Sequence, residues 1–223
     1  MTAPSRGRFA GTGFWATFHL VRNLRRRGTL LWVIGLPLLA AAMRLGFGVD
    51  EDVIGELVLV YLVPLMSLAY GGGVLREEVE DQTLTYGFTR PVDRAGLYAA
   101  RLFAAAGPVL IATVPAAAFA AKGVGSGLGL VAAALLGTAA HTALFGLWGL
   151  LMRRPTWFGL AFVLVWESSL EKVPGWLASV TLRTQLRNLG GLDLPGLGMF
   201  GGTDHGAWWL SALVLRAIAA ACV

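Results

Sequence analysis

Long apolar runs alternate with short polar stretches along nearly the whole chain. A helix needs about 20 apolar residues to cross a hydrocarbon core of ~30 Å at ~1.5 Å per residue. Four of the runs reach or approach this length, and two are shorter. The pattern predicts an all-α membrane protein built as a single transmembrane domain, with six spans at residues 29–47, 53–75, 97–121, 128–152, 156–170 and 207–223.

Residues 8–28, which precede the first span, form an amphipathic segment. Phe14, Phe18 and Val21 fall on one helical face, and a basic cluster follows them: Arg22, Arg25, Arg26 and Arg27. This pattern is typical of a helix that lies in the membrane interface, with aromatic rings at the acyl boundary and arginines on lipid phosphates. Membrane lipids are therefore expected partners. The alternative is a charged flank that only sets the orientation of the first span.

The stretch 76–94 between the second and third spans is the most acidic part of the chain, with five of its thirteen acids. Such a polar stretch cannot lie in hydrocarbon, so it must project into water. Leu75, Val79, Thr83 and Tyr86 recur at roughly helical spacing, which predicts a short amphipathic helix that continues span two. A rigid polar helix fixed between two spans can act as a lever, because a partner that binds it can move both spans. The alternative is a solvated connector that binds nothing.

Composition and charge place this pattern in a membrane rather than on nucleic acid. The chain is 56% hydrophobic and 14% charged, against roughly 25% charged residues in soluble domains. Its basic residues lie beside apolar runs, so we expect no nucleic-acid partner. With the N-terminus in the cytoplasm, the inner segments hold eleven lysines and arginines and the outer segments four. The positive-inside rule then predicts a multi-pass protein of the cytoplasmic membrane, with residues 171–206 outside.

Ionisable side chains inside predicted spans are candidates for translocation or gating, because charge at membrane depth is unfavourable. Glu167 lies late in span five, where a substrate or gating role competes with structural pairing. Glu56 lies near the outer end of span two and is expected to pair with Arg44. His141, in the middle of span four, is expected to be neutral and bonded to a neighbouring helix. Arg101 is expected to extend to the cytoplasmic face.

No catalytic signature accompanies these residues. The sequence holds no G-x-S-x-G, no H-E-x-x-H and no phosphate loop of the G-x-x-x-x-G-K-[ST] type. One isolated histidine does not make a metal site. We therefore expect no enzyme activity, no cofactor and no metal in this chain. An intramembrane enzyme and a membrane anchor or mechanical-coupling subunit without transport remain the alternatives to a transporter.

The run GGGVLREEVEDQTLTYGFTRPVDRAGLYAARLFA at residues 71–104 resembles the signature region of type-2 ABC transporter permeases. That family has a small-residue end to span two, an acidic helix of the form EE-x-x-x-x-T-L, a Thr-Arg-Pro turn and a basic start to span three. The matching positions are Glu77-Glu78, Thr83-Leu84, Thr89-Arg90-Pro91, Arg94 and Arg101. The basic segment before span one and a glutamate late in span five also match. The chain departs from the family at Arg101, where lysine is commoner, and in its abrupt end within span six.

The resemblance implies a permease that moves a substrate across, and outward through, the cytoplasmic membrane. It implies a cytoplasmic coupling helix between spans two and three, and a re-entrant outer segment between spans five and six. Two copies of a separate ABC ATPase would bind ATP and Mg²⁺, and a second permease copy, identical or related, would complete a dimer. The implied ATPase-coupling residues are Glu77, Glu78, Glu80, Asp81, Thr83, Leu84, Tyr86, Arg90 and Pro91.

Overall fold

The computed structural model describes residues 12–73, 94–152, 154–170 and 181–192, together with positions 213, 216, 217 and 220. Every regular element in these ranges is helical. Four helical stretches among the described residues are long and apolar enough to span a membrane: Arg27–Gly46, Glu51–Gly71, Gly96–Ala120 and Val124–Leu151. They agree with the first four predicted spans to within a few residues, so a multi-pass helical membrane architecture is confirmed. Most of the predicted span at 207–223 and most of the segment 171–206 lie outside the described residues.

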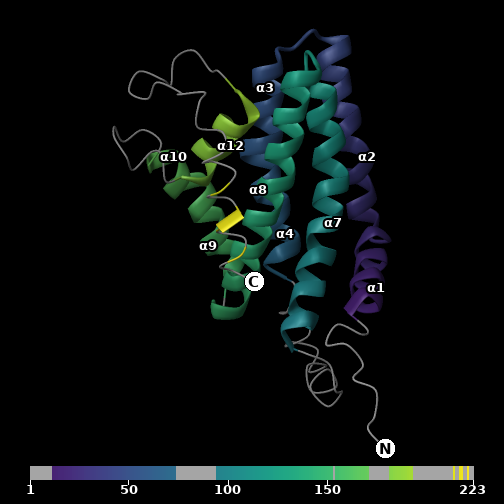
Figure 1. Cartoon of the computed structure of the whole chain (residues 1–223), viewed down its shortest axis with the longest axis vertical. Coiled ribbons are helices and arrows are strands. Elements are labelled where there is room, and N and C mark those ends of the chain that lie inside the picture. Colours follow the sequence, from purple (N-terminus) through teal and green to yellow (C-terminus); the bar gives the residue numbers. More distant parts are fainter. Residues whose placement is uncertain are drawn as a thin grey trace, which may run out of the picture.

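The four spanning stretches stand side by side as an elongated bundle (Figure 1). The first consists of α2 (Arg27–Ala41) and η1 (Ala42–Gly46), and the second of α3 (Glu51–Glu56), η2 (Leu57–Leu62) and α4 (Val63–Gly71). The third is α7 (Arg94–Ala120) and the fourth α8 (Val124–Leu151). Helix α7 packs against α2, α4 and α8. The outer face of α2 leaves large apolar side chains exposed, as expected for a surface in contact with lipid.

Small residues allow these helices to approach closely. Gly149 of α8 lies against the backbone of Gly72 at the end of α4, where an added Cβ would come within 2.7 Å of the Gly72 carbonyl oxygen. The buried face of α7 is lined largely by alanines, among them Ala105, Ala112 and Ala116. Close backbone contact is the usual basis of helix association in lipid, where apolar burial supplies little net driving force.

The second spanning helix is not a uniform α-helix. Residues Leu57–Leu62 form a π-helical segment immediately before Pro64. Proline has no N–H and its ring clashes with the carbonyl four residues earlier, which disrupts the preceding α-helical turn. The wider turn accommodates this disruption, because π segments bond residue i to residue i+5. A similar π segment, η3 (Phe162–Trp166), precedes Glu167.

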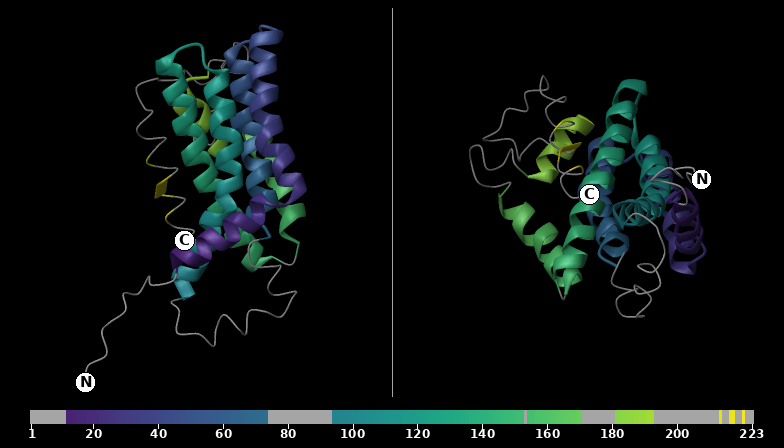
Figure 2. Two further views of the ribbon diagram at one scale, coloured as in Figure 1. Left: turned by 90° about the vertical axis from the view of Figure 1, so that its right-hand side faces the viewer. Right: turned by 60° about the horizontal axis from the view of Figure 1, so that its bottom comes forward.

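Helix α1 (Thr12–Leu24) runs obliquely beneath one end of the bundle (Figure 2). It packs on α7, where Gly107 makes room for Leu20, and the Asn23 side-chain amide donates to the Ala104 carbonyl at 3.3 Å. Phe14 and Phe18 are exposed on its other side. The predicted amphipathic helix before span one is therefore present, although the described helix is shorter than residues 8–28. A turn at Arg25-Arg26 separates it from α2.

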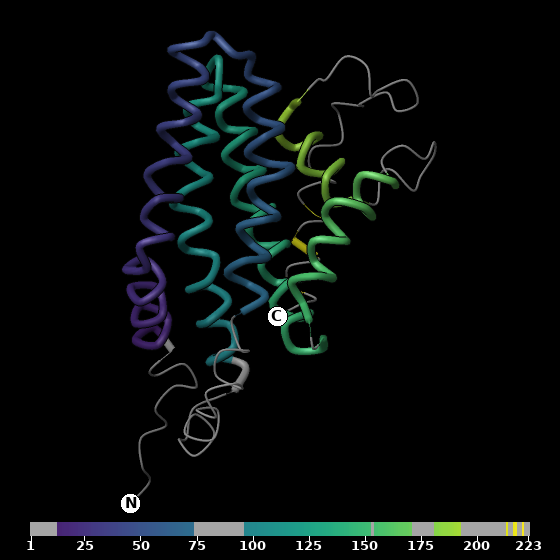
Figure 3. Tube along the Cα trace, turned by 180° about the vertical axis from the view of Figure 1, so that it is seen from behind, coloured from purple at the N-terminus to yellow at the C-terminus, as the bar shows by residue number. Residues whose placement is uncertain are grey.

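A separate arm contacts α4 and α8 through α9 (Pro155–Ala161) and diverges from the bundle toward its other end (Figure 3). It consists of α9, η3 and α10 (Glu167–Leu170), which form one helical run over the predicted fifth span. Helix α12 (Leu182–Gly190) lies between this arm and the bundle and packs on α8. The Thr181 hydroxyl caps its start by accepting from the Thr184 amide, and Gly191 ends it in the left-handed conformation at φ 65°.

Candidate functional site

The polar side chains that concern function gather at two places in the described structure. One lies where α12 meets the second spanning helix and is called here the α12 cluster: Glu56, Tyr61, Ser168, Arg183 and Arg187. The other lies where α1 crosses the bundle and is called here the α1 pocket: His19, Arg22, Asn23, Arg26, Ala69, Tyr70, Gly73, Arg101 and Ala105. They occupy different ends of the second spanning helix, since Glu56 is near its start and Gly73 follows its end.

Glu56 is the centre of the α12 cluster. Its carboxylate accepts hydrogen bonds from Arg187 Nε at 2.7 Å, from Arg187 Nη2, and from Arg183 Nη2 at 3.1 Å. The three side chains are only 13%, 12% and 7% exposed for Glu56, Arg187 and Arg183. Buried charged side chains are normally paired and hydrogen-bonded, and here both arginines pair with the same acid.

Arg183 makes three further contacts that tie separate elements together. Its Nη2 donates to the Tyr61 hydroxyl at 2.7 Å, and its guanidinium carbon lies 4.8 Å from the centroid of the Tyr61 ring, a cation–π distance. Its Nη1 donates to Ser168 Oγ of α10 at 3.1 Å. One guanidinium group therefore joins α12, the second spanning helix and the separate arm.

Local sequence explains how these groups meet. Arg183 and Arg187 are four residues apart on α12 and so share a face, while Leu182, Leu186 and Leu189 pack against the bundle. In a regular α-helix, residues five apart would point about 140° from each other. The π turn of η2 brings residues five apart closer to one face, which places Tyr61 on the side of Glu56.

Glu167 borders this cluster. It is 1% exposed at the start of α10, next to Ser168, and it interacts electrostatically with Arg183. One of its carboxylate oxygens, Oε1, has no hydrogen-bond partner among the residues that the structure describes. Two of the three candidates for translocation or gating, Glu56 and Glu167, are thus brought to one place.

The predicted pairing of Glu56 with Arg44 is wrong. Arg44 Nη1 instead donates to the Val49 carbonyl at 3.2 Å and closes the turn between the first two spans. Glu56 faces α12, which lies in the predicted outer segment 171–206. The signal was the spacing of Arg183 and Arg187 on a segment whose other face is leucine.

His141 lies apart from the α12 cluster, in the buried interior of α8. Its Nδ1 is 2.8 Å from the Gly137 carbonyl one turn earlier, and its ring centroid is 5.9 Å from that of Phe145. The bond is within its own helix, so the expected bond to a neighbouring helix is not found. Its Nε2 has no hydrogen-bond partner within the described ranges.

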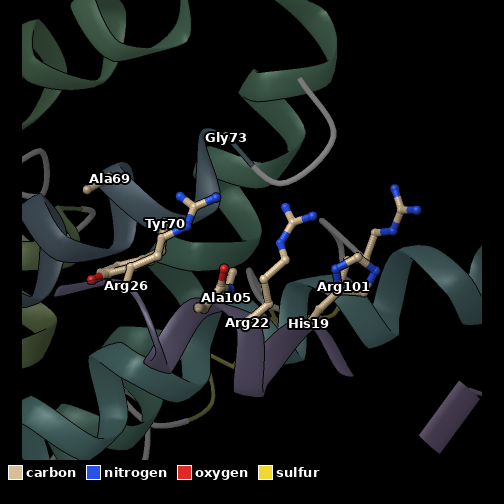
Figure 4. A pocket seen from close by; sticks show the side chains of 9 residues that line it. His19, Arg22, Arg26, Ala69, Tyr70, Gly73, Arg101 and Ala105 are labelled. Carbon is tan, nitrogen blue, oxygen red and sulfur yellow. The ribbon is translucent and has the colours of Figure 1, made fainter. Parts of the chain in front are cut away.

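The α1 pocket is a cavity of about 50 Å³ (Figure 4). Arg22 comes from α1, Arg26 from the residue before α2, and Arg101 from α7, while Tyr70 closes one side and donates its hydroxyl to Thr29 at 2.7 Å. Arg101 is 6% exposed. Arg101 was expected to extend to the cytoplasmic face; it lies in this pocket, between α1 and the end of the second spanning helix.

The implied coupling residues cannot be placed in this geometry. Glu77, Glu78, Glu80, Asp81, Thr83, Leu84, Tyr86, Arg90 and Pro91 all lie outside the described residues. The chain enters this stretch after Gly73, which lines the α1 pocket, and returns at the start of α7, the helix that supplies Arg101 to the same pocket.

Neither place resembles a metal centre, since no three His, Cys, Asp or Glu side chains of the described residues lie together. Comparisons of the chain with protein-family models, with curated proteins and with solved structures found no match.

Proposed function

We propose that the chain is the permease subunit of an ATP-driven transporter of the type-2 ABC class. The observation that supports this most directly is the position of the two ends of the acidic stretch. Both Gly73, before it, and Arg101, two turns into α7 after it, line the pocket that also holds Arg22 and Arg26. The stretch therefore leaves and re-enters the bundle at its arginine-rich end, which the positive-inside rule assigns to the cytoplasm.

This placement suits a lever. A partner that moves the acidic stretch acts on the end of α4 and the start of α7 together. Helix α4 is in backbone contact with α8 through Gly72 and Gly149, and α7 packs on α1, α2, α4 and α8. Movement of the acidic stretch would therefore be transmitted through these contacts to every spanning helix of the described bundle, as rigid-body switching requires.

We propose that the α12 cluster acts as a latch in the same mechanism, that is, as an ionic contact at the end of the bundle opposite the acidic stretch. Glu56 and the end of α4 belong to one continuous helical stretch, Glu51–Gly71. Displacement of that stretch changes the position of Glu56 against Arg183 and Arg187. We propose that the latch holds α12 against the bundle in the state seen here and that its release opens the outer side. The cargo is not assigned.

The chain would work with two copies of a separate ATPase and with a second permease copy, identical or related. The partner would bind ATP and Mg²⁺, because this sequence has no phosphate loop of its own. Co-purification with an ATPase encoded beside it tests the complex, and stimulated ATP hydrolysis in vesicles tests the coupling.

A sharper test reverses the charge of three acids in the stretch. With Glu77, Glu78 and Glu80 all changed to lysine, we expect normal membrane insertion and loss of the stimulated ATP hydrolysis. The matched control reverses Asp50, an exposed acid at the opposite end of the same helical stretch, and should leave stimulation unchanged. Normal stimulation in the triple variant would refute the coupling role. Coupled hydrolysis without any vesicle transport would instead support a non-transporting mechanical subunit, and failure to bind any ATPase would reopen the intramembrane enzyme.

A further inference from the structure

We infer that the interface between α4 and α8 binds water at a buried polar site, called here the α8 site: Ser67, Thr138, His141 and Thr142. Ser67 belongs to α4 and the other three to α8. All four side chains are at most 2% exposed. Each holds an atom that has no hydrogen-bond partner among the described residues, namely Nε2 of the histidine and the hydroxyl oxygen of the other three. The inference does not depend on transport or on an ATPase partner.

Helical spacing brings these four residues to one contact between the helices. Thr138, His141 and Thr142 stand at positions i, i+3 and i+4, so they share a face of α8. That face meets α4, because a Cβ added at Gly71 would lie 3.1 Å from the Thr142 carbonyl oxygen. Ser67 lies one turn before Gly71 and therefore points the same way. The second and fourth spanning stretches run in the same direction, since one span separates them, so Ser67 lies level with the turn of α8 before Thr142.

The threonines of the α8 site differ from a buried threonine that is satisfied within its own helix. Thr113 of α7 is 0% exposed, and its Oγ1 donates to the Val109 carbonyl one turn earlier at 2.8 Å. Bonding back to the carbonyl four residues earlier is a common way for a helical hydroxyl to find a partner. The hydroxyls of Thr138 and Thr142 make no such bond. They are therefore available to a group that enters between α4 and α8.

His141 identifies the kind of group that the site requires. Its Nδ1 lies 2.8 Å from the Gly137 carbonyl oxygen, and because that oxygen only accepts, Nδ1 carries the proton of the bond. In the neutral ring Nε2 is then an acceptor that needs a donor. Water donates to Nε2 and keeps a second donor and its own acceptors for the hydroxyls. Buried waters typically make about three such bonds, and one water needs only about 10–15 Å³, which suits a contact lined by serine, threonine and glycine.

Solid-state NMR of the full-length chain in lipid bilayers tests the site. The histidines are isotope-labelled, and magnetisation is transferred to their ring nitrogens from water protons in one experiment and from lipid acyl protons in another. The His141 signals are identified by their loss in H141Q. We expect rapid transfer from water to His141 Nε2, although the side chain is fully buried. In S67A/T138V, which removes two hydroxyls of the site, this transfer should fall by about twofold or more.

The matched control is T113V, which removes an equally buried hydroxyl that is already bonded within α7 and should leave the transfer unchanged. Transfer to Nε2 from acyl protons alone in wild type would mean that the contact is dry, and would overturn the inference. An equal fall in T113V and S67A/T138V would mean general hydration of the bundle, and no fall in S67A/T138V would mean that the hydroxyls hold no water; either result overturns it as well. Because the wild-type spectrum alone can refute the site, the test does not require every variant to fold.

Discussion

Replacing Glu56 with glutamine removes the one charge on which both arginines of the α12 cluster converge. Glutamine has nearly the same shape, so the change isolates charge from packing. Arg183 and Arg187 would then be left buried with a neutral partner. Removal of one member of a buried ion pair typically destabilises by about 3–5 kcal/mol. We expect the low end of this range, about 3 kcal/mol, because Arg183 keeps its hydrogen bonds to Tyr61 and Ser168.

This loss of stability should weaken the packing of α12 against the bundle. Hydrogen exchange of the α12 backbone amides measures this weakening directly. Since 1.4 kcal/mol corresponds to a factor of ten, about 3 kcal/mol should speed exchange of the α12 amides roughly a hundredfold. The control is D50N. Asp50 also forms an ion pair, with Lys122 Nζ at 3.6 Å, but the two side chains are 76% and 49% exposed. Exposed pairs contribute about 0–1 kcal/mol, so α12 exchange should hardly change.

A companion variant tests whether charge is the cause. In E56Q/R187Q one of the two arginines that face position 56 is also removed, so part of the lost protection should return. Exchange within about threefold of wild type in E56Q, or an equal increase in D50N, would show that the cluster does not hold α12. The absence of any recovery in the double variant would show that geometry rather than charge had been disturbed.

Three further predictions concern close approaches and topology. In G149A the new Cβ would lie 2.7 Å from the Gly72 carbonyl oxygen, so α4 and α8 must separate; we expect a loss of about 1–3 kcal/mol, read as a lower thermal midpoint in detergent. A Cβ added at Gly107 would lie 2.2 Å from Leu20 Cδ1 of α1. The valine of G107V should therefore push α1 away from α7, and the backbone amides of α1 should exchange faster. A cysteine at Glu78 should react with membrane-impermeant reagents only from the cytoplasmic side; labelling from outside would invert the topology.

Two glycines provide controls for the packing variants. An added Cβ at Gly35 of α2 or at Gly125 of α8 meets nothing within 4 Å. Alanine at either position changes helix propensity in the same direction as G149A, without a clash. A midpoint that falls equally in G35A and G149A would refute the contact between α4 and α8 as the cause.

Features that depend on local sequence were predicted well. Four spans follow from the length of apolar runs, which the cost of exposed backbone in lipid makes a strong constraint. The amphipathic face of α1 was also readable, because Phe14, Phe18 and Val21 repeat at helical spacing and are exposed in the structure.

Features that depend on tertiary placement were not predictable. The spacing of Arg183 and Arg187 is compatible with one face of a helix, but it does not indicate which acid that face meets. Chain proximity suggested Arg44 for Glu56, whereas the second spanning helix turns this acid toward α12 instead. The π turn at Leu57–Leu62 leaves no signature in hydropathy, yet it helps to bring Tyr61 to the cluster. Arg101 is buried where α7 meets α1 and the end of the second spanning helix, which its place in the sequence does not reveal.

The two ends of the second spanning helix are held by different physical forces, and this difference can be tested. At one end, α12 is attached by a buried ionic cluster that salt in solution screens weakly. At the other, the α1 pocket is lined by the exposed arginines Arg22 and Arg26, where salt and lipid charge act strongly. The helix between them, Glu51–Gly71, spans about 32 Å at 1.5 Å per residue. A rigid helix of this length would transmit a shift from one end to the other, whereas the π turn in its first half offers a point at which it can bend. Raised salt should therefore speed exchange in α1 directly, and the proposed lever requires that exchange in α12 rises with it through the helix. Faster exchange in α1 with α12 unchanged would show that the π turn absorbs the shift, and would count against the lever.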